Sequence, residues 1–223
     1  MSASPLEIRA LRPEDIPEVA RQHFAAFGDP TRNGHSVATL GPTFLSDVFY
    51  RLNLDNPGFH CDVAWAGERI VAFTVFSTDK DNVFSHLIRK HPAGLVLSSL
   101  KQLLRRPSSL RAFLANAMYL RGERLAFLDG VPGWWVVCAI LPDFRSASGE
   151  ERVGRRIVVD FLDRMEELMT ELACPAWYGV VDPSNTPINK VLQRRGAAEA
   201  GRARAQGLDM VYYVKRFDSG ESR

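Results

Sequence analysis

The stretch GWWVVCAILPDFRSASGEERVGRRIVVDFL, residues 133–162, joins an apolar run, a basic loop and the first turns of a helix. Residues 134–141 are apolar throughout, which is typical of a buried strand. Four arginines and two glycines follow between residues 145 and 158. The amides at a helix N-terminus lack intrahelical acceptors and carry the positive end of the helix dipole. This order of elements therefore predicts an anion-binding site.

A second segment, AWYGVVDPSNTPINKVLQRRGA at residues 176–197, has the same order of strand, turn and helix. The strand is expected at 176–181, and the short helix ends at Gly196. Asn185 precedes this helix, so it can either cap the helix or reach a ligand. If the two strands run parallel and diverge, their carboxyl ends border a cleft, which is where open α/β sheets bind ligands.

The rest of the chain adds antiparallel strands and further helices. Alternating and helical apolar spacings predict these elements: a strand at 6–11, a helix after Pro13, a helix at 42–53, a hairpin at 60–79, a helix at 153–173 and a C-terminal hairpin at 198–217. Their order predicts a single α/β domain over residues 1–223, with a mixed, mostly antiparallel sheet flanked by helices.

Residues 82–122 differ from their surroundings, because they contain seven Lys and Arg and not one Asp or Glu. Their apolar residues recur at helical spacing, so we predict a helical basic insertion within the domain. Two roles stay open for it. It covers the sheet with its arginines in solvent, or it forms a lid whose charge suits an anionic ligand or weak contact with a membrane surface.

Composition excludes several classes of protein. With 46% apolar residues, 24% charged residues and a net charge of +2, the chain shows no field that favours nucleic acid. It has no apolar run long enough to span a membrane and no signal-peptide pattern, so we expect a cytoplasmic protein. The three cysteines and five histidines show no disulfide framework and no metal-ligand spacing, and we expect no metal.

Several motifs resemble the GNAT superfamily of acetyl-CoA-dependent N-acetyltransferases, over residues 6–80 and 124–217. Ile140 to Arg145 correspond to the family's V-x-P-x-x-R at the end of a strand, and Val181 to Asn185 correspond to V-x-x-x-N. Gly196 stands where the family has a glycine. The resemblance implies that acetyl-CoA binds between the two strands, with its pyrophosphate on the loop that follows Pro142.

The pyrophosphate loop fits in two registers. Starting at Arg145, a serine replaces the first glycine; starting at Gly149, Arg152 stands where a glycine is usual. We favour the second register, because it places Gly154 where the backbone must approach the phosphate closely. The resemblance then implies this set of coenzyme-binding residues: Ile140, Leu141, Arg145, Arg152, Val153, Gly154, Arg155 and Asn185.

The catalytic groups depart from the family. Its usual proton-donating tyrosine falls at Leu192, so a replacement acid is sought at Tyr178 or Tyr212. The strand before Pro142 holds no carboxylate. Asp129 is the best-placed general base, although an aspartate in the turn DGVPG has an ordinary structural explanation. Cys138 lies mid-strand without a base beside it in sequence, which disfavours an acyl-enzyme route.

The function implied by the resemblance is direct acetyl transfer from acetyl-CoA to a small-molecule amine. Two alternatives remain open: a non-catalytic domain that senses acetyl-CoA, as Leu192 suggests, and an acyltransferase that uses longer acyl chains in a tunnel formed by the insertion. The sequence is compatible with a monomer and with a homodimer.

The preferred loop register has a direct test. Replacing Gly154 by Glu puts a bulky carboxylate where the phosphate should approach, so coenzyme A binding measured by calorimetry should be abolished. Ser148→Ala is the control and should bind normally. If Ser148→Ala loses binding and Gly154→Glu retains it, the first register is the correct one.

Overall fold

The computed structural model describes residues 6–29, 37–105, 125–144, 151–205 and 208–217. The elements of its first half are β1 (Leu6–Ala10), a 3-10 turn (Pro13–Asp15), α1 (Ile16–Phe27), α2 (Pro42–Phe44), β2 (Phe59–Ala66) and β3 (Arg69–Ser77). The helix predicted at 42–53 is present but irregular. It continues from α2 as a π-helical segment, Leu45–Tyr50, and a 3-10 turn, Arg51–Asn53.

The second half contains the two segments that the sequence singles out. Its elements are α3 (Asn82–Lys90), α4 (Pro92–Arg105), the 3-10 turn η5 (Ala126–Leu128), β4 (Gly133–Ile140), α6 (Glu151–Glu171), β5 (Ala176–Val181), α7 (Thr186–Arg194), β6 (Ala198–Ala205) and β7 (Leu208–Arg216). Leu172, expected on the apolar face of the long helix, lies just beyond α6 and is 50% exposed. Within the described residues no helix is long and apolar enough to cross a membrane.

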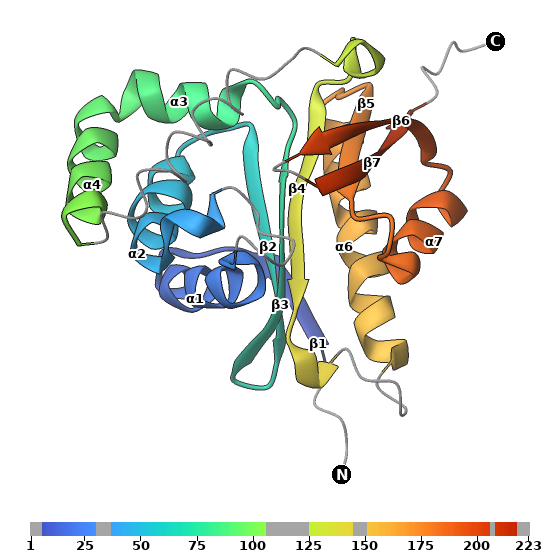
Figure 1. The fold of residues 1–223 in the computed structure, drawn as a ribbon. Coiled ribbons are helices and arrows are strands. Elements are labelled where there is room, and N and C mark those ends of the chain that lie inside the picture. Colours follow the sequence, from blue (N-terminus) through green and yellow to red (C-terminus); the bar gives the residue numbers. More distant parts are fainter. Residues whose placement is uncertain (1–5, 30–36, 106–124, 145–150, 206–207, 218–223) are drawn as a thin grey trace.

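The strands form one sheet with the order β1-β2-β3-β4-β5-β7-β6 (Figure 1). All neighbouring pairs are antiparallel except β4 and β5, which are parallel. A parallel pair needs a crossover connection, and α6 provides it. The C-terminal hairpin places β7, not β6, against β5. The predicted mixed, mostly antiparallel sheet is confirmed.

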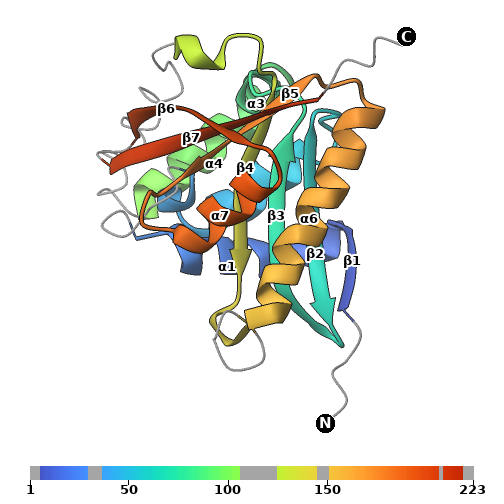
Figure 2. The ribbon, with the colours of Figure 1, turned by 90° about the vertical axis from the view of Figure 1, so that its right-hand side faces the viewer.

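Helices cover both faces of the sheet. The helices α1 to α4 lie on one side and α6 and α7 on the other (Figures 1 and 2). On the first side, Gln22 of α1 donates a 2.8 Å hydrogen bond to the Ile70 carbonyl of β3, and His23 Nδ1 lies 2.8 Å from the Tyr50 hydroxyl. These buried contacts satisfy polar groups that would otherwise be costly to bury.

Charged side chains fasten α6 and α7 on the other side. Arg164 of α6 pairs with the buried Asp62 of β2 at 3.2 Å. Glu166 of α6 accepts from Arg195 at the end of α7 and from Lys215 of β7, each at 2.8 Å. Because one carboxylate contacts cations from two elements, it fixes α7 and β7 relative to α6.

A β-bulge interrupts β4 at Val136. Val75 pairs with Val137 and Phe76 with Trp135, so Val136 is the extra residue. Val136 and Val137 consequently both pack into the core on the α1 side. The Thr74 hydroxyl accepts from Trp135 Nε1 at 2.8 Å and donates to the Val137 carbonyl at 3.2 Å, which bridges the two ends of the bulge.

Removing this bridge should destabilise the protein. Thr74→Val keeps the shape of the side chain but leaves the buried Trp135 N–H without its acceptor, so we expect a loss of about 2–3 kcal/mol in the free energy of unfolding. Thr74→Ser keeps the hydroxyl and should cost only about 1 kcal/mol for the lost methyl group. Urea denaturation measures both, and equal losses in the two variants would show that the hydroxyl bridge contributes nothing.

Candidate active site

The two parallel strands separate after a short contact. They pair at Gly133 with Trp177, Trp134 with Tyr178 and Trp135 with Gly179. Beyond this point β4 runs to Ile140 and β5 to Val181, both described throughout, with no further pair between them. The bulge at Val136 follows the last pair directly. Because a bulge bends its strand, it accounts for the divergence at this residue.

Backbone geometry separates the roles of Ile140 and Leu141. The Leu141 N–H donates to the Val71 carbonyl of β3 at 2.9 Å. Alternate residues of an antiparallel strand direct their backbone groups to opposite neighbours, so those of Ile140 point toward the side of β5. Of the two amides predicted to position a coenzyme, only that of Ile140 therefore faces the diverging strands.

The predicted anion site lies where α6 begins. A 3-10 turn, Pro142–Phe144, follows β4, and α6 starts at Glu151 next to the end of that strand (Figure 2). Arg152, Val153, Gly154 and Arg155 all fall in the first turns of α6, and the amides of Arg152 and Val153 are among those that lack intrahelical acceptors. The structure gives the backbone of these four residues only, and Arg145 lies outside the described residues.

Asn185 caps α7. Its side chain accepts a 3.5 Å hydrogen bond from the Ile188 N–H, and its N–H donates to the Asp182 carbonyl at 2.9 Å. Asn189 Nδ2 donates to the carbonyls of Asp182 and Pro183 at 3.3 and 3.1 Å. Of the two roles that the sequence leaves open for Asn185, the structure shows the cap; a ligand contact stays a prediction.

Aromatic side chains line up on the α1 side of the diverging strands. Trp134 and Tyr178 stack with ring centroids 6.0 Å apart and an interplanar angle of 5°, and Tyr178 and Tyr212 stack at 6.4 Å and 22°. Phe127 of η5 meets Tyr212 edge to face at 5.3 Å. We call these four residues the aromatic row. It brings together both tyrosines that the sequence suggests as acids.

Lys80 connects the aromatic row to the turn that holds Asp129. Its ammonium lies 5.9 Å from the centre of the Tyr178 ring and donates to the Leu128 carbonyl at 3.2 Å. Asp129 is the next residue; it is exposed, and Gly130 after it has φ of +71°. This conformation explains the glycine and agrees with a turn. Asp129 thus lies two residues after Phe127 of the aromatic row, and its side chain is exposed to solvent.

Two other residues lie on the opposite face. Leu192, which stands at the position of the family's tyrosine, is fully buried in the core that α6 and α7 form with the sheet. Cys138 is half-buried and packs in the same layer, away from the aromatic row. Neither side chain is placed to act on a group held at the row.

Several residues of this region were not predicted from sequence. Lys80 belongs to no motif, and Thr74 is one hydroxyl in an apolar strand. Trp134 and Trp135 are consecutive residues of an apolar strand, so their side chains point to opposite faces of the sheet. Alternation along β4 could have assigned them, and in the structure Trp134 joins the aromatic row while Trp135 packs under α6.

Comparison with known proteins identifies the fold. The sequence matches no protein-family profile and no curated protein. Solved structures match over nearly the whole chain. SsHAT has 18% identity and a TM-score of 0.56, covering 95% of this chain and 98% of its own.

Two further structures agree. NAA60 of Arabidopsis thaliana, in complex with a bisubstrate analogue, has 10% identity and a TM-score of 0.53, with 96% and 99% covered. The spermidine/spermine N-acetyltransferase SpeG of Vibrio cholerae has 10% identity and a TM-score of 0.51, with 95% and 92% covered. At such identities the likeness establishes the fold and not the reaction. The chain therefore has the fold of the GNAT N-acetyltransferases.

Proposed function

We propose that the protein transfers the acetyl group of acetyl-CoA to the amine of a small-molecule acceptor. The observation that carries this proposal is the divergence of β4 and β5 directly after Trp135 and Gly179, together with the start of α6 beyond the carboxyl end of β4. A parallel pair that opens beside a helix N-terminus offers backbone amides to a thioester arm and positive potential to a pyrophosphate. The fold shared with N-acetyltransferases supports the same reaction.

The residues predicted to bind this substrate follow in a definite order. We expect Arg145, Arg152 and Arg155 to supply charge to the pyrophosphate, and the amides of Arg152 and Val153 lie at the helix start. The backbone of Ile140 faces the diverging strands, on the side that we assign to the pantetheine arm. Asn185 and the turn before α7 follow β5, on the other side of the opening between the two strands. This order directs the acetyl group toward the point where the two strands meet.

Acetyl-CoA supplies an activated thioester carbonyl. The neutral amine adds to this carbon, a C–N bond forms and the C–S bond breaks. The nitrogen loses one proton as the amide forms, and the leaving thiolate takes up one proton. Tyr178 is the best-placed donor, because it is adjacent to Gly179, the last residue of β5 that pairs with β4. Tyr212 lies one ring further along the row. Asp129 removes the proton of the acceptor ammonium, either directly or through water.

The acceptor should approach from the α1 side, where the aromatic row lies. Flat rings and the half-buried Lys80 favour an acceptor with an apolar body. Lys80 and the basic segment 82–122 would also suit an anionic group on this acceptor. With all three cysteines present as thiols, the protein suits a reducing compartment, and we propose that the reaction takes place in the cytoplasm.

The acid has a test with a matched control. Tyr178→Phe keeps the stacked ring and removes only the hydroxyl, so kcat for thiol release should fall about 100-fold while the Kd for acetyl-CoA stays unchanged. Tyr213→Phe removes a hydroxyl from the opposite face, where it accepts from Gln193 at 3.3 Å, and should keep full activity. Full activity in Tyr178→Phe would remove Tyr178 as the acid, and Tyr212→Phe would then be measured in the same way.

The base is tested by Asp129→Asn, which keeps the size of the side chain but cannot accept a proton. The expected result is a fall of about 100-fold in kcat, with coenzyme binding intact. Asp209→Asn removes an equally exposed carboxylate from β7 and serves as the control. Equal rates in both variants would assign Asp129 to the turn alone.

One observation favours the second candidate, a domain that binds acetyl-CoA without transferring it. Leu192 replaces the family's proton donor and is fully buried, so α7 contributes packing and no acid. Calorimetry with acetyl-CoA together with thiol release across a panel of amines and acyl-chain lengths separates the candidates. Binding of acetyl-CoA without thiol release for any amine would support the sensor. Thiol release only with longer acyl chains would support an acyltransferase that uses such chains.

A further inference from the structure

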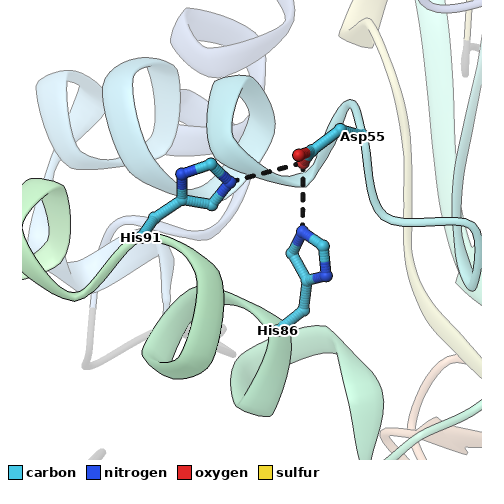
Figure 3. Close-up of side chains that lie close together, drawn as sticks. All are labelled: Asp55, His86 and His91. Carbon is cyan, nitrogen blue, oxygen red and sulfur yellow. Dashed lines mark hydrogen bonds and ion pairs between the residues drawn. The ribbon is translucent and has the colours of Figure 1, made fainter.

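Three potential metal ligands lie together outside the diverging strands. His86 belongs to α3, His91 to the joint between α3 and α4, and Asp55 to the turn before β2 (Figure 3). The Asp55 Oδ1 lies 3.0 Å from His86 Nε2 and 3.4 Å from His91 Nε2. One carboxylate oxygen thus meets two imidazole nitrogens. The expectation of no metal rested on sequence spacing, which does not place Asp55 beside the histidines.

The separations suit a bound ion. Ligands that bind one Zn²⁺ at about 2.0–2.2 Å with tetrahedral angles are roughly 3.3–3.6 Å apart; the His91 contact of Asp55 lies in this range, and the His86 contact is slightly shorter. All three ligand atoms lie within 4.8 Å of one another. The His91 side chain is 29% exposed, so it is less constrained by packing than the side chain of His86.

The surrounding structure holds two of the ligands in place. The side chain of His86 is only 8% exposed, so packing fixes its ring and directs Nε2 toward Asp55. His91 has its N–H bonded to the Leu87 carbonyl at 3.0 Å and its carbonyl bonded to the Leu95 N–H at 2.9 Å. The backbone of the joint is thus fixed by hydrogen bonds on both sides. A rigid backbone with ligands already turned inward lowers the cost of binding an ion.

The third ligand leaves room for solvent. The Asp55 side chain is 63% exposed, and its second oxygen is not part of either histidine contact. Three protein ligands with an open side are the arrangement in which water completes the coordination of zinc.

We propose that Asp55, His86 and His91 bind a divalent transition-metal ion of the zinc type. Two imidazole nitrogens and one carboxylate oxygen prefer Zn²⁺, Co²⁺ or Ni²⁺ to the hard ions Mg²⁺ and Ca²⁺, which take oxygen ligands. The site connects the segment between α3 and α4, through His91, to the turn before β2, through Asp55. A bound ion therefore fixes the described helices of the basic segment to the sheet-forming part of the chain. This proposal does not depend on acetyl transfer.

Calorimetry on the full chain, stripped with a chelator and titrated with Zn²⁺ alone, tests the site. The expected result is one ion per chain, and the single variants His86→Ala, His91→Ala and Asp55→Asn should each bind at least about tenfold more weakly. His60→Ala is the control. It removes a histidine of β2 that stacks on Phe76 of β3, away from the cluster, and it should bind Zn²⁺ as the parent does. Mg²⁺ should give no saturable binding.

Two further measurements keep the test independent of folding defects. Co²⁺ should give the visible absorption of a nitrogen- and oxygen-ligated ion in the parent and in His60→Ala but not in Asp55→Asn, a surface change that leaves the core intact. Saturating Zn²⁺ should raise the Tm of the parent and not of Asp55→Asn. Saturable binding that is equal in the parent and the three cluster variants would overturn the proposal, as would the absence of saturable binding. The cluster would then be an Asp–His hydrogen-bonded group only.

Discussion

The bridge from Thr74 to Trp135 and Val137 fixes the point at which β4 leaves β5. The extra residue Val136 follows the last pair of the two parallel strands directly, and a bulge bends its strand, so it turns β4 away from β5 at this point. The Thr74 hydroxyl accepts a hydrogen bond from Trp135 Nε1 and donates one to the Val137 carbonyl. Both bonds lie inside the sheet, where unpaired polar groups raise the free energy of the folded state. A single buried threonine thus couples the stability of the sheet to the opening on which the proposed function depends.

The bulge also assigns side chains to the two faces. Before it, Trp134 faces the α1 side and Trp135 the α6 side; after it, Cys138 and Ile140 share the face of Trp135. The α1 face holds the aromatic row within its own core cluster, whereas the α6 face packs against α6 and α7. The groups of the proposed reaction therefore lie on one face of the sheet, and the charged contacts of Glu166 keep α7 on the other.

Much of this arrangement follows from the sequence. The strand at 134–141, the helix at 153–173 and the strand at 176–181 are strongly patterned, and each lies within a residue or two of its predicted bounds. The bulge could not be predicted, because a run of apolar residues looks the same on both faces. The contacts of Lys80 and of the group Asp55, His86 and His91 could not be predicted for another reason. They join residues that are 31 to 98 positions apart in the sequence, and local sequence patterns do not indicate such long-range contacts.

The buried position of Leu192 limits where a proton donor can come from. A leucine in the core of α7 neither donates a proton nor leaves a gap for another side chain to do so, because the layer under α6 is closed by apolar packing. In the proposed reaction we therefore assign the donor to the α1 face, where Tyr178 and Tyr212 belong to the aromatic row. A domain that only binds acetyl-CoA needs the rings for shape, whereas a transferase needs a hydroxyl beside the point where the strands meet. The chain has a tyrosine at that point, and this favours transfer over binding alone.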